Sequence, residues 1–213
     1  MDRWLVFVLI GMSSLVVLIF GWRLLSSRHL LPCPAVFIWM LENRIMENVA
    51  GSAELIRRAQ ISPGMNVLDA GCGPGRVSLP LAEFVAPEGK VVAVDVQAEM
   101  LDILRERIDQ ADVDNLEIIH AGLGEGRLPI STFDRALMVT VLGEIPNQAE
   151  ALREIHQALK PGGMLSITEV LPDPHYQKRD KVRRLGEACG FSIDEAYVGR
   201  RAFTLNLIKP EGG

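Results

Sequence analysis

Cysteine is scarce in this sequence, and its spacing excludes several kinds of site. The 213 residues include three cysteines, Cys33, Cys72 and Cys189, and no two of them form a C-x-x-C pair. An odd number of cysteines at wide intervals gives no support to a zinc site or a redox motif. We therefore expect reduced, buried thiols and no bound metal.

A surplus of positive charge is also missing. The chain has 22 Lys and Arg residues against 27 Asp and Glu residues, which gives a net charge of −5 and a pI of about 5.4. This balance offers no electrostatic reason to expect a nucleic-acid partner. Internal repeats and low-complexity segments are absent as well. The length suits an N-terminal segment followed by one domain that buries its own core.

An uncharged run occupies the N-terminus. No charged side chain occurs from Trp4 to Trp22, and a helix needs about 20 apolar residues to cross a bilayer. Tryptophan at both ends suits the membrane interface, and Arg23 and Arg28 direct the following chain to the cytoplasm. We therefore expect residues 1–28 to form a single-pass membrane anchor with the C-terminal domain cytoplasmic. A cleaved signal peptide and a buried core helix are the alternatives.

Residues 29–62 are expected to form a helical cap or linker. From 34 to about 60, apolar residues recur at three- and four-residue spacing, which predicts an amphipathic helix. A second helical stretch at 52–59 would begin with Ser52 as its N-cap. The apolar face is not rich in Lys and Arg, so we favour packing against the next domain, with partial capping of a ligand site, over a purely interfacial role.

Beyond residue 63, apolar strand patterns alternate with helical patterns. Strands are expected at 66–70, 90–95, 116–120, 133–140, 164–170, 192–198 and 202–208, and helices at 77–85, 98–110, 148–159 and 180–189. Such alternation implies a parallel sheet with helices on both faces. Three residues separate the last two strands, which is too few for a parallel crossover, so these strands must form an antiparallel hairpin.

The expected fold class is therefore a doubly wound, Rossmann-like α/β domain at 63–213. Its seven-stranded sheet is mostly parallel and ends in the antiparallel hairpin, and a transmembrane helix precedes the domain. In such a sheet, ligands bind beyond the carboxyl ends of the strands.

A glycine-rich loop follows the first strand in the segment 67–75, VLDAGCGPG. Gly71 and Gly73 allow a tight turn and a close approach of the backbone to a ligand, while Gly75 lets the next helix pack on the strand. Asp95 ends the second strand about 20 residues later, where a carboxylate can accept hydrogen bonds from a ribose diol.

A nicotinamide-dependent enzyme shares these features, but its fingerprint spaces the glycines differently. The third glycine comes one residue early, and Arg76 stands where that fingerprint has Gly or Ala. Asp69 also places a negative charge beside the loop, which suits a cationic amine or sulfonium ligand better than a pyrophosphate.

Together these motifs resemble the class I S-adenosylmethionine-dependent methyltransferases, in particular the UbiE/type 11 group of small-molecule enzymes. The resemblance covers about 63–210. Segments 67–75 and 91–95 match the first two family motifs, 128–134 resembles the approach to the fourth strand, 159–163 matches the turn before the fifth strand, and 188–191 resembles the A-G-F turn.

The resemblance implies S-adenosylmethionine as cofactor and a set of binding residues. Asp69 would hold the amino group, Asp95 the ribose hydroxyls, and Val96 with Met100 the adenine. Where the family usually has an Asp for the adenine amino group, this chain has Gly122; Glu125 or a backbone carbonyl would have to replace it. The full expected set is Asp69, Ala70, Gly71, Cys72, Gly73, Gly75, Asp95, Val96, Met100, Gly122, Leu123 and Val139.

Methyl transfer needs position and electrostatics more than a nucleophilic side chain, and a general base helps only if the acceptor must lose a proton. Glu144, after the fourth strand, is one candidate base, with a solvated carboxylate as the alternative. His175 and Tyr176, in the loop after the fifth strand, are the others, with a structural role as the alternative. His156 is expected to be a solvated helix residue.

The sequence therefore predicts methyl transfer to a small, lipophilic acceptor at the cytoplasmic membrane face. The anchor motivates the lipophilic acceptor. Two alternatives stay open. One is a non-catalytic, membrane-tethered binding or assembly factor that keeps the fold, and the other is an NAD(P)-dependent oxidoreductase.

Overall fold

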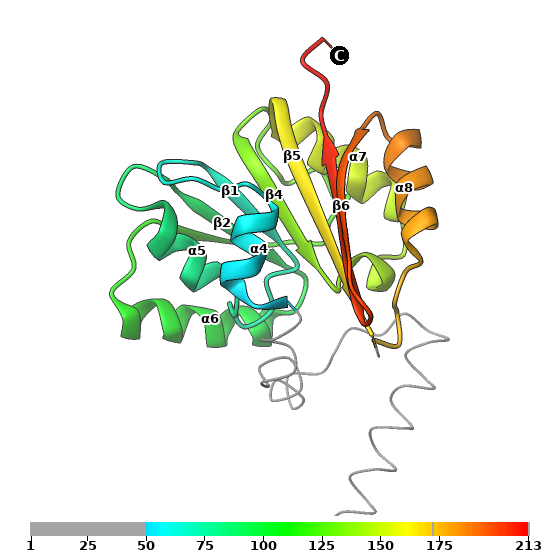
Figure 1. Ribbon diagram of the computed structural model, residues 1–213. Helices are drawn as coiled ribbons and strands as arrows, with labels where there is room; N and C mark the ends of the chain where they lie inside the picture. Colours follow the sequence, from blue (N-terminus) through cyan, green and yellow to red (C-terminus); the bar gives the residue numbers. More distant parts are fainter. Residues whose placement is uncertain (1–49, 172, 213) are drawn as a thin grey trace, which may run out of the picture.

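The computed structural model describes residues 50–171 and 173–212, which form one mixed sheet with helices on both faces (Figure 1). The strands are β1 (Val67–Ala70), β2 (Val91–Asp95), β3 (Leu116–His120), β4 (Phe133–Val139), β5 (Leu159–Val170), β6 (Ser192–Val198) and β7 (Ala202–Ile208). The helices are α4 (Ser52–Arg58), α5 (Ser78–Val85), α6 (Ala98–Ala111), η2 (Leu142–Glu144), α7 (Gln148–Ala158) and α8 (Arg179–Ala188).

The central strands are short and apolar, and both of their faces are buried. Every residue of β1 and β2 is buried, as expected for strands that helices cover on both sides. Side chains alternate between the faces along a strand, so the core divides into two clusters. Val67, Val91 and Leu137 pack with α4, α5 and α6, whereas Leu68 and Ile167 pack with α7 and α8. The predicted doubly wound arrangement is confirmed.

The strand order is β3-β2-β1-β4-β5-β7-β6. The chain runs outward from β1 to β3 and then returns to β4, so the direction of winding reverses between β1 and β4. A crevice forms beyond the carboxyl ends of the strands at such a reversal. The glycine loop leaves β1 at this point, which places it in the crevice.

The two C-terminal strands form the predicted hairpin, with the predicted limits. β7 runs antiparallel to both β5 and β6, and Val170 pairs with Ala202. This pairing brings the hairpin tip, residues 199–201, to the same edge of the sheet as the carboxyl end of β5. In Figure 1 the tip lies at the lower end of the sheet.

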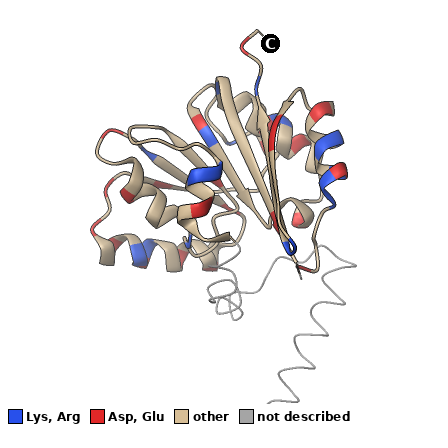
Figure 2. Ribbon diagram, viewed as in Figure 1, with Lys and Arg blue, Asp and Glu red and all other residues tan. Residues whose placement is uncertain are grey.

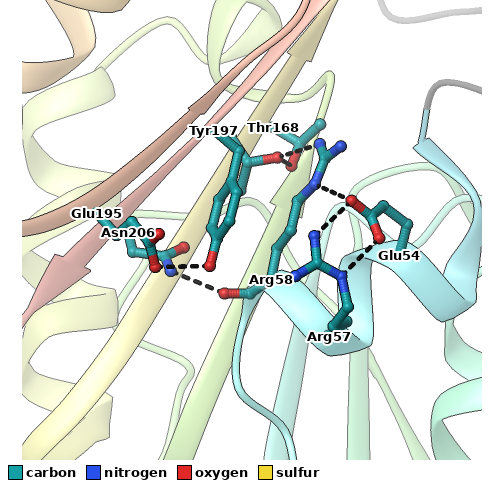
Figure 3. A network of polar contacts seen from close by, with 8 residues as sticks. Glu54, Arg57, Arg58, Thr168, Glu195, Tyr197 and Asn206 are labelled. Atoms are coloured by element: carbon teal, nitrogen blue, oxygen red, sulfur yellow. Dashed lines mark hydrogen bonds and ion pairs between the residues drawn. The ribbon is translucent and has the colours of Figure 1, made fainter.

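Helix α4 is fastened to the hairpin by polar contacts (Figure 3). Arg58 donates to the Thr204 hydroxyl at 3.0 Å, and the Asn206 amide donates to the Arg58 carbonyl at 2.8 Å. The Arg58 guanidinium also lies over the Tyr197 ring, 5.5 Å from its centre. These contacts agree with packing of this segment against the domain. The N-cap prediction was wrong: Gly51 is the N-cap, and no side chain caps the helix.

The start of β5 shows the largest difference from the predicted limits. β5 begins at Leu159 instead of residue 164, because Leu159 pairs with Phe133 and the glycines before residue 164 exchange hydrogen bonds with Lys209. The expected membrane span and the amphipathic pattern before residue 50 lie outside the described residues. Among residues 50–171 and 173–212, no helix is long and apolar enough to cross a bilayer. The other predicted limits agree to within one residue.

Candidate active site

The glycine loop is held against the end of β2 by its backbone. The N–H groups of Gly71 and Cys72 both donate to the Val94 carbonyl, at 2.8 and 3.0 Å. Gly71 has a φ of +80°, and a Cβ there would lie 2.4 Å from a Val141 methyl carbon. Gly73 also has a positive φ, but nothing lies within 4 Å of its Cβ position. The loop therefore turns tightly at Gly71 and presents open space at Gly73.

Asp95 joins the second strand to this loop. Its two carboxylate oxygens accept from the backbone N–H of Gly73 at 2.8 Å and of Gln97 at 2.9 Å. Burial raises the pKa of Asp95, and these backbone hydrogen bonds oppose the rise. Each carboxylate oxygen has a second lone pair, so the group can also accept hydrogen bonds from a diol in the crevice.

Asp69 lies one strand away and is more deeply buried. Its carboxylate accepts from the Ser78 hydroxyl at 2.6 Å. Burial raises its pKa to about 6, while the Ser78 hydrogen bond and the positive charge of Arg76 oppose the rise. Since this value is below neutral, Asp69 is mainly ionised at pH 7 and presents a negative charge beside the glycine loop.

These groups line a cavity of about 590 Å³. Most residues expected to bind the cofactor border it. They are Asp69, Gly71, Cys72, Gly73, Asp95, Val96, Met100, Gly122, Leu123 and Val139. Ala70 and Gly75 do not border it. Ala70 is fully buried in the core, and a Cβ on Gly75 would lie 2.3 Å from a Leu104 methyl carbon, so Gly75 serves helix packing.

The end of the Glu125 side chain lies beside Gly122. Its Oε1 lies 2.6 Å from the position that a Cβ on Gly122 would take, and both residues line the cavity. An aspartate at 122 would carry its own carboxylate oxygens at about this distance from that Cβ. The structure therefore puts a carboxylate next to the position at which the motif lacks one.

A buried acid on α7 shapes the loop that carries Glu125. The Glu154 carboxylate accepts from the backbone N–H groups of Gly124, Arg127 and Leu128. The Arg127 and Leu128 contacts measure 2.6 and 3.0 Å. Because three donors of one loop share this acceptor, Glu154 determines the path of the loop along the cavity. Glu154 was not predicted from the sequence, because it lies on a helix distant from the motifs.

Glu144 is the one expected catalytic residue that borders the cavity. It ends η2 and is half-buried. Burial raises its pKa to about 8, and the negative charges of Asp173, Asp95 and Glu169 add to the rise. A carboxylate with a pKa near the working pH suits general acid–base catalysis.

His175 and Tyr176 are not among the residues that line this cavity. His175 is 5% exposed and lies against Gly143. The carbonyl oxygen of His175 lies 1.9 Å from the position that a Cβ on Gly143 would take. Tyr176 packs edge-on against Phe203, with 5.9 Å between ring centres, and lines a different, smaller cavity. Neither residue therefore borders the cavity that Glu144 and the glycine loop line, although His175 lies beside η2.

The prediction for His156 was wrong. Its ring packs edge-on against Phe191 with 4.8 Å between ring centres, and its Nε2 is buried. Burial and the positive charge of Lys209 lower its pKa. The short loop after α8 folds back onto α7, which explains why this face of the helix is covered.

Of the loop after β4, only Glu144 was predicted from the sequence to belong to the site. Thr140, Val141, Ile145 and Pro146 all line the cavity, and Thr140 has a φ of +57°, which is uncommon for a β-branched residue. Backbone strain of this kind concentrates at functional sites. The sequence could indicate these residues only through their place in the chain, because this loop follows β4, the strand that pairs with β1 where the winding reverses.

Comparisons with known proteins agree with this geometry. Residues 67–163 match the family model described as methyltransferase domain. Over these residues, which run from β1 into β5, the chain is similar to that methyltransferase domain. A demethylmenaquinone methyltransferase from Listeria welshimeri is 36% identical over 116 residues, and one from Geobacillus stearothermophilus is 31% identical. Each alignment covers 54% of this chain, and the chain spans about half the length of these relatives (49% and 50%).

Solved structures show the same fold over more of the chain. An S-adenosylmethionine-dependent methyltransferase from Aquifex aeolicus has a TM-score of 0.77 at 24% identity and covers 84% of this chain and 100% of its own. The cyclase SpnF has a TM-score of 0.68 at 18% identity, covering 76% of this chain and 80% of its own. The resemblance inferred from the motifs is confirmed, and the fold alone does not determine the reaction.

Proposed function

We propose that the protein transfers the methyl group of S-adenosylmethionine to a small, lipophilic acceptor. The observation that carries the proposal is the set of three carboxylates around one cavity, Asp69, Asp95 and Glu125, together with the open space at Gly73. Their spacing along three neighbouring strand ends suits a ligand with an amine, a ribose and an adenine in sequence. The matched methyltransferase domain supports the same cofactor.

Each carboxylate has a distinct task in this proposal. Asp69, ionised and buried, holds the cationic amino end. Asp95 accepts hydrogen bonds from the ribose hydroxyls while its other lone pairs keep the glycine loop in place. Glu125 accepts a hydrogen bond from the adenine amino group. When bound, the cofactor supplies an activated sulfonium methyl group, and the chain supplies position and a cavity that limits water.

Glu144 is the proposed general base. It reaches the cavity from η2, on the side of β4, whereas Asp95 and Glu125 lie on the side of β2 and β3. An acceptor that is methylated at a hydroxyl oxygen or an activated ring carbon must release a proton. The ionised Glu144 accepts that proton, and the mainly apolar residues around it, Val141, Ile145 and Pro146, suit a lipophilic ring.

The names of the relatives support an acceptor of the menaquinone type, and the uncharged N-terminal run supports a location at the cytoplasmic membrane face. In this proposal the N-terminal segment holds the chain at the bilayer in which such an acceptor dissolves. The non-catalytic alternative, a tethered binding factor, predicts cofactor binding without transfer to any acceptor.

The decisive experiment measures label transfer from S-adenosylmethionine with a radioactive methyl group. The full-length protein is reconstituted in lipid vesicles with a reduced demethylated naphthoquinone, or with a polar phenol as comparison. We expect transfer to the quinol that falls at least tenfold in Asp95→Asn and is unchanged in Asp102→Asn, an exposed residue of α6. Cofactor binding with no transfer to any lipophilic acceptor would favour the binding factor.

A further inference from the structure

A cationic and apolar surface surrounds the tip of the β6–β7 hairpin, outside the cavity described above. We call it the hairpin surface. Its members are Leu171, Lys178, Arg179, Val198, Arg200 and Arg201, which line a second cavity of about 280 Å³ together with Tyr176 and other residues. In Figure 2 basic residues colour the hairpin tip and the start of α8.

The charge of this surface is opposite to that of the whole chain. Four cations and one carboxylate, Asp180, border the second cavity, although the chain has a net charge of −5. Arg179 lies 3.8 Å from Asp180, with both side chains exposed. Lys178, Arg200 and Arg201 have no carboxylate partner within the described part of the chain. The surface therefore offers unneutralised positive charge to a partner.

Exposed aliphatic side chains accompany these cations. Among the described residues, five large hydrophobic side chains are exposed, and two of them, Leu171 and Val198, belong to the hairpin surface. Val198 is 62% exposed and ends β6, two residues before Arg200. Cations beside exposed aliphatic groups fit a lipid interface, where phosphates meet acyl chains. A nucleic acid would meet the charge but leave the aliphatic groups in water.

The hairpin surface lies at the same edge of the sheet as the active site. Val170 pairs with Ala202, so the hairpin tip lies at the carboxyl edge of the sheet, where the large cavity also lies. We propose that the hairpin surface docks on an anionic phospholipid bilayer and turns the carboxyl edge of the sheet toward the membrane. This deepens the proposed function and rests on it, since a lipophilic acceptor would enter from that side.

The test places a fluorophore that senses polarity on the hairpin tip. Val198→Cys is labelled in full-length protein carrying Cys33→Ser, because Cys72 and Cys189 are buried. The matched control is Ile130→Cys, which is 75% exposed and precedes β4, at the opposite edge of the sheet. Each protein is reconstituted in vesicles of phosphatidylcholine alone or mixed with phosphatidylglycerol.

We expect a blue-shifted emission at residue 198 in the anionic vesicles only, reversed by high salt, and no change at residue 130. Removing both tip arginines, in Arg200→Ser with Arg201→Ser, should lower the equilibrium constant for docking of the tip on the anionic vesicles about 30-fold, because each cation near an anionic surface contributes about 1 kcal/mol. The double lysine variant keeps the charge and should dock. These residues are exposed, and unchanged thermal unfolding would show that the variants fold.

Equal emission in both vesicle types, or equal responses at residues 198 and 130, would overturn the proposal. A response to soluble polyglutamate without lipid would also overturn it, in favour of an acidic protein partner. The measurement reads lipid contact and not methyl transfer. A chain that docks but transfers no methyl group would therefore refute the proposed function and leave the docking intact.

Discussion

The replacement of a missing acid by Glu125 gives the most specific prediction. In Glu125→Ala, the cavity loses the carboxylate that lies beside Gly122. Gly122 does not have a positive φ, and the atoms that a Cβ there would meet belong to the flexible end of Glu125. An aspartate at 122 therefore fits once Glu125 is shortened, so Gly122→Asp in the Glu125→Ala background should restore the carboxylate.

The expected magnitude follows from the exposure of Glu125. A hydrogen bond to a charged group contributes about 1.5–3 kcal/mol when buried, and an exposed carboxylate contributes less. We expect a loss of about 1 kcal/mol of binding free energy, which raises the dissociation constant of the cofactor about fivefold. Glu106→Ala, which shortens an exposed glutamate of α6, should leave it unchanged.

Calorimetric titration with S-adenosylhomocysteine and its inosine analogue checks this account. The analogue lacks the adenine amino group, so its affinity should not change in Glu125→Ala, while that of the adenosine compound should fall and then recover in the double variant. Equal losses for both ligands, or no recovery with Gly122→Asp, would refute the assignment of Glu125 to the adenine.

Three other carboxylates give predictions that differ in their readouts. Glu144→Gln should lower kcat by 10²–10⁴-fold, and the wild-type rate should rise with pH through about 8, as the base ionises; a Gln variant with the same pH profile would contradict the role. Burial raises the pKa of Glu169 to about 8, so the folded state binds this proton more tightly than the unfolded state, and stability should fall as pH rises from about 4.5 to about 8. Glu169→Gln should flatten this decline in urea titrations, by on the order of a few kcal/mol at pH 8. Glu154→Ala should lower the free energy of unfolding by about 2–4 kcal/mol, because three backbone donors lose their acceptor; a loss under 1 kcal/mol in urea titration would show that water replaces the carboxylate.

The periodic parts of the fold could be predicted from sequence because their signals are local. The apolar strands, the glycine turn and the three-residue gap before β7 each act over a few residues. Asp95 could also be predicted, because the sequence shows both that it ends a strand and how many residues separate it from the glycine loop. Parallel pairing then brings these separate positions to one edge of the sheet.

Other features depend on how distant segments meet. The rule that loops at the carboxyl edge face the ligand selected His175 and Tyr176, but the turn after β5 folds back against Gly143 and Phe203. The role of Glu154 could not be predicted from the sequence, because it depends on α7 lying beside the loop at 124–128. Nothing in the sequence around His156 indicates that Phe191, which follows α8, covers its ring.

Direct binding of S-adenosylmethionine to the full-length protein tests the central claim most directly. Equilibrium titration, with NADH as competitor, should give one saturable site that NADH does not displace, and Asp95→Asn should weaken it at least tenfold while Asp102→Asn should not. Absence of saturable binding, or displacement by NADH at similar concentration, would contradict the account.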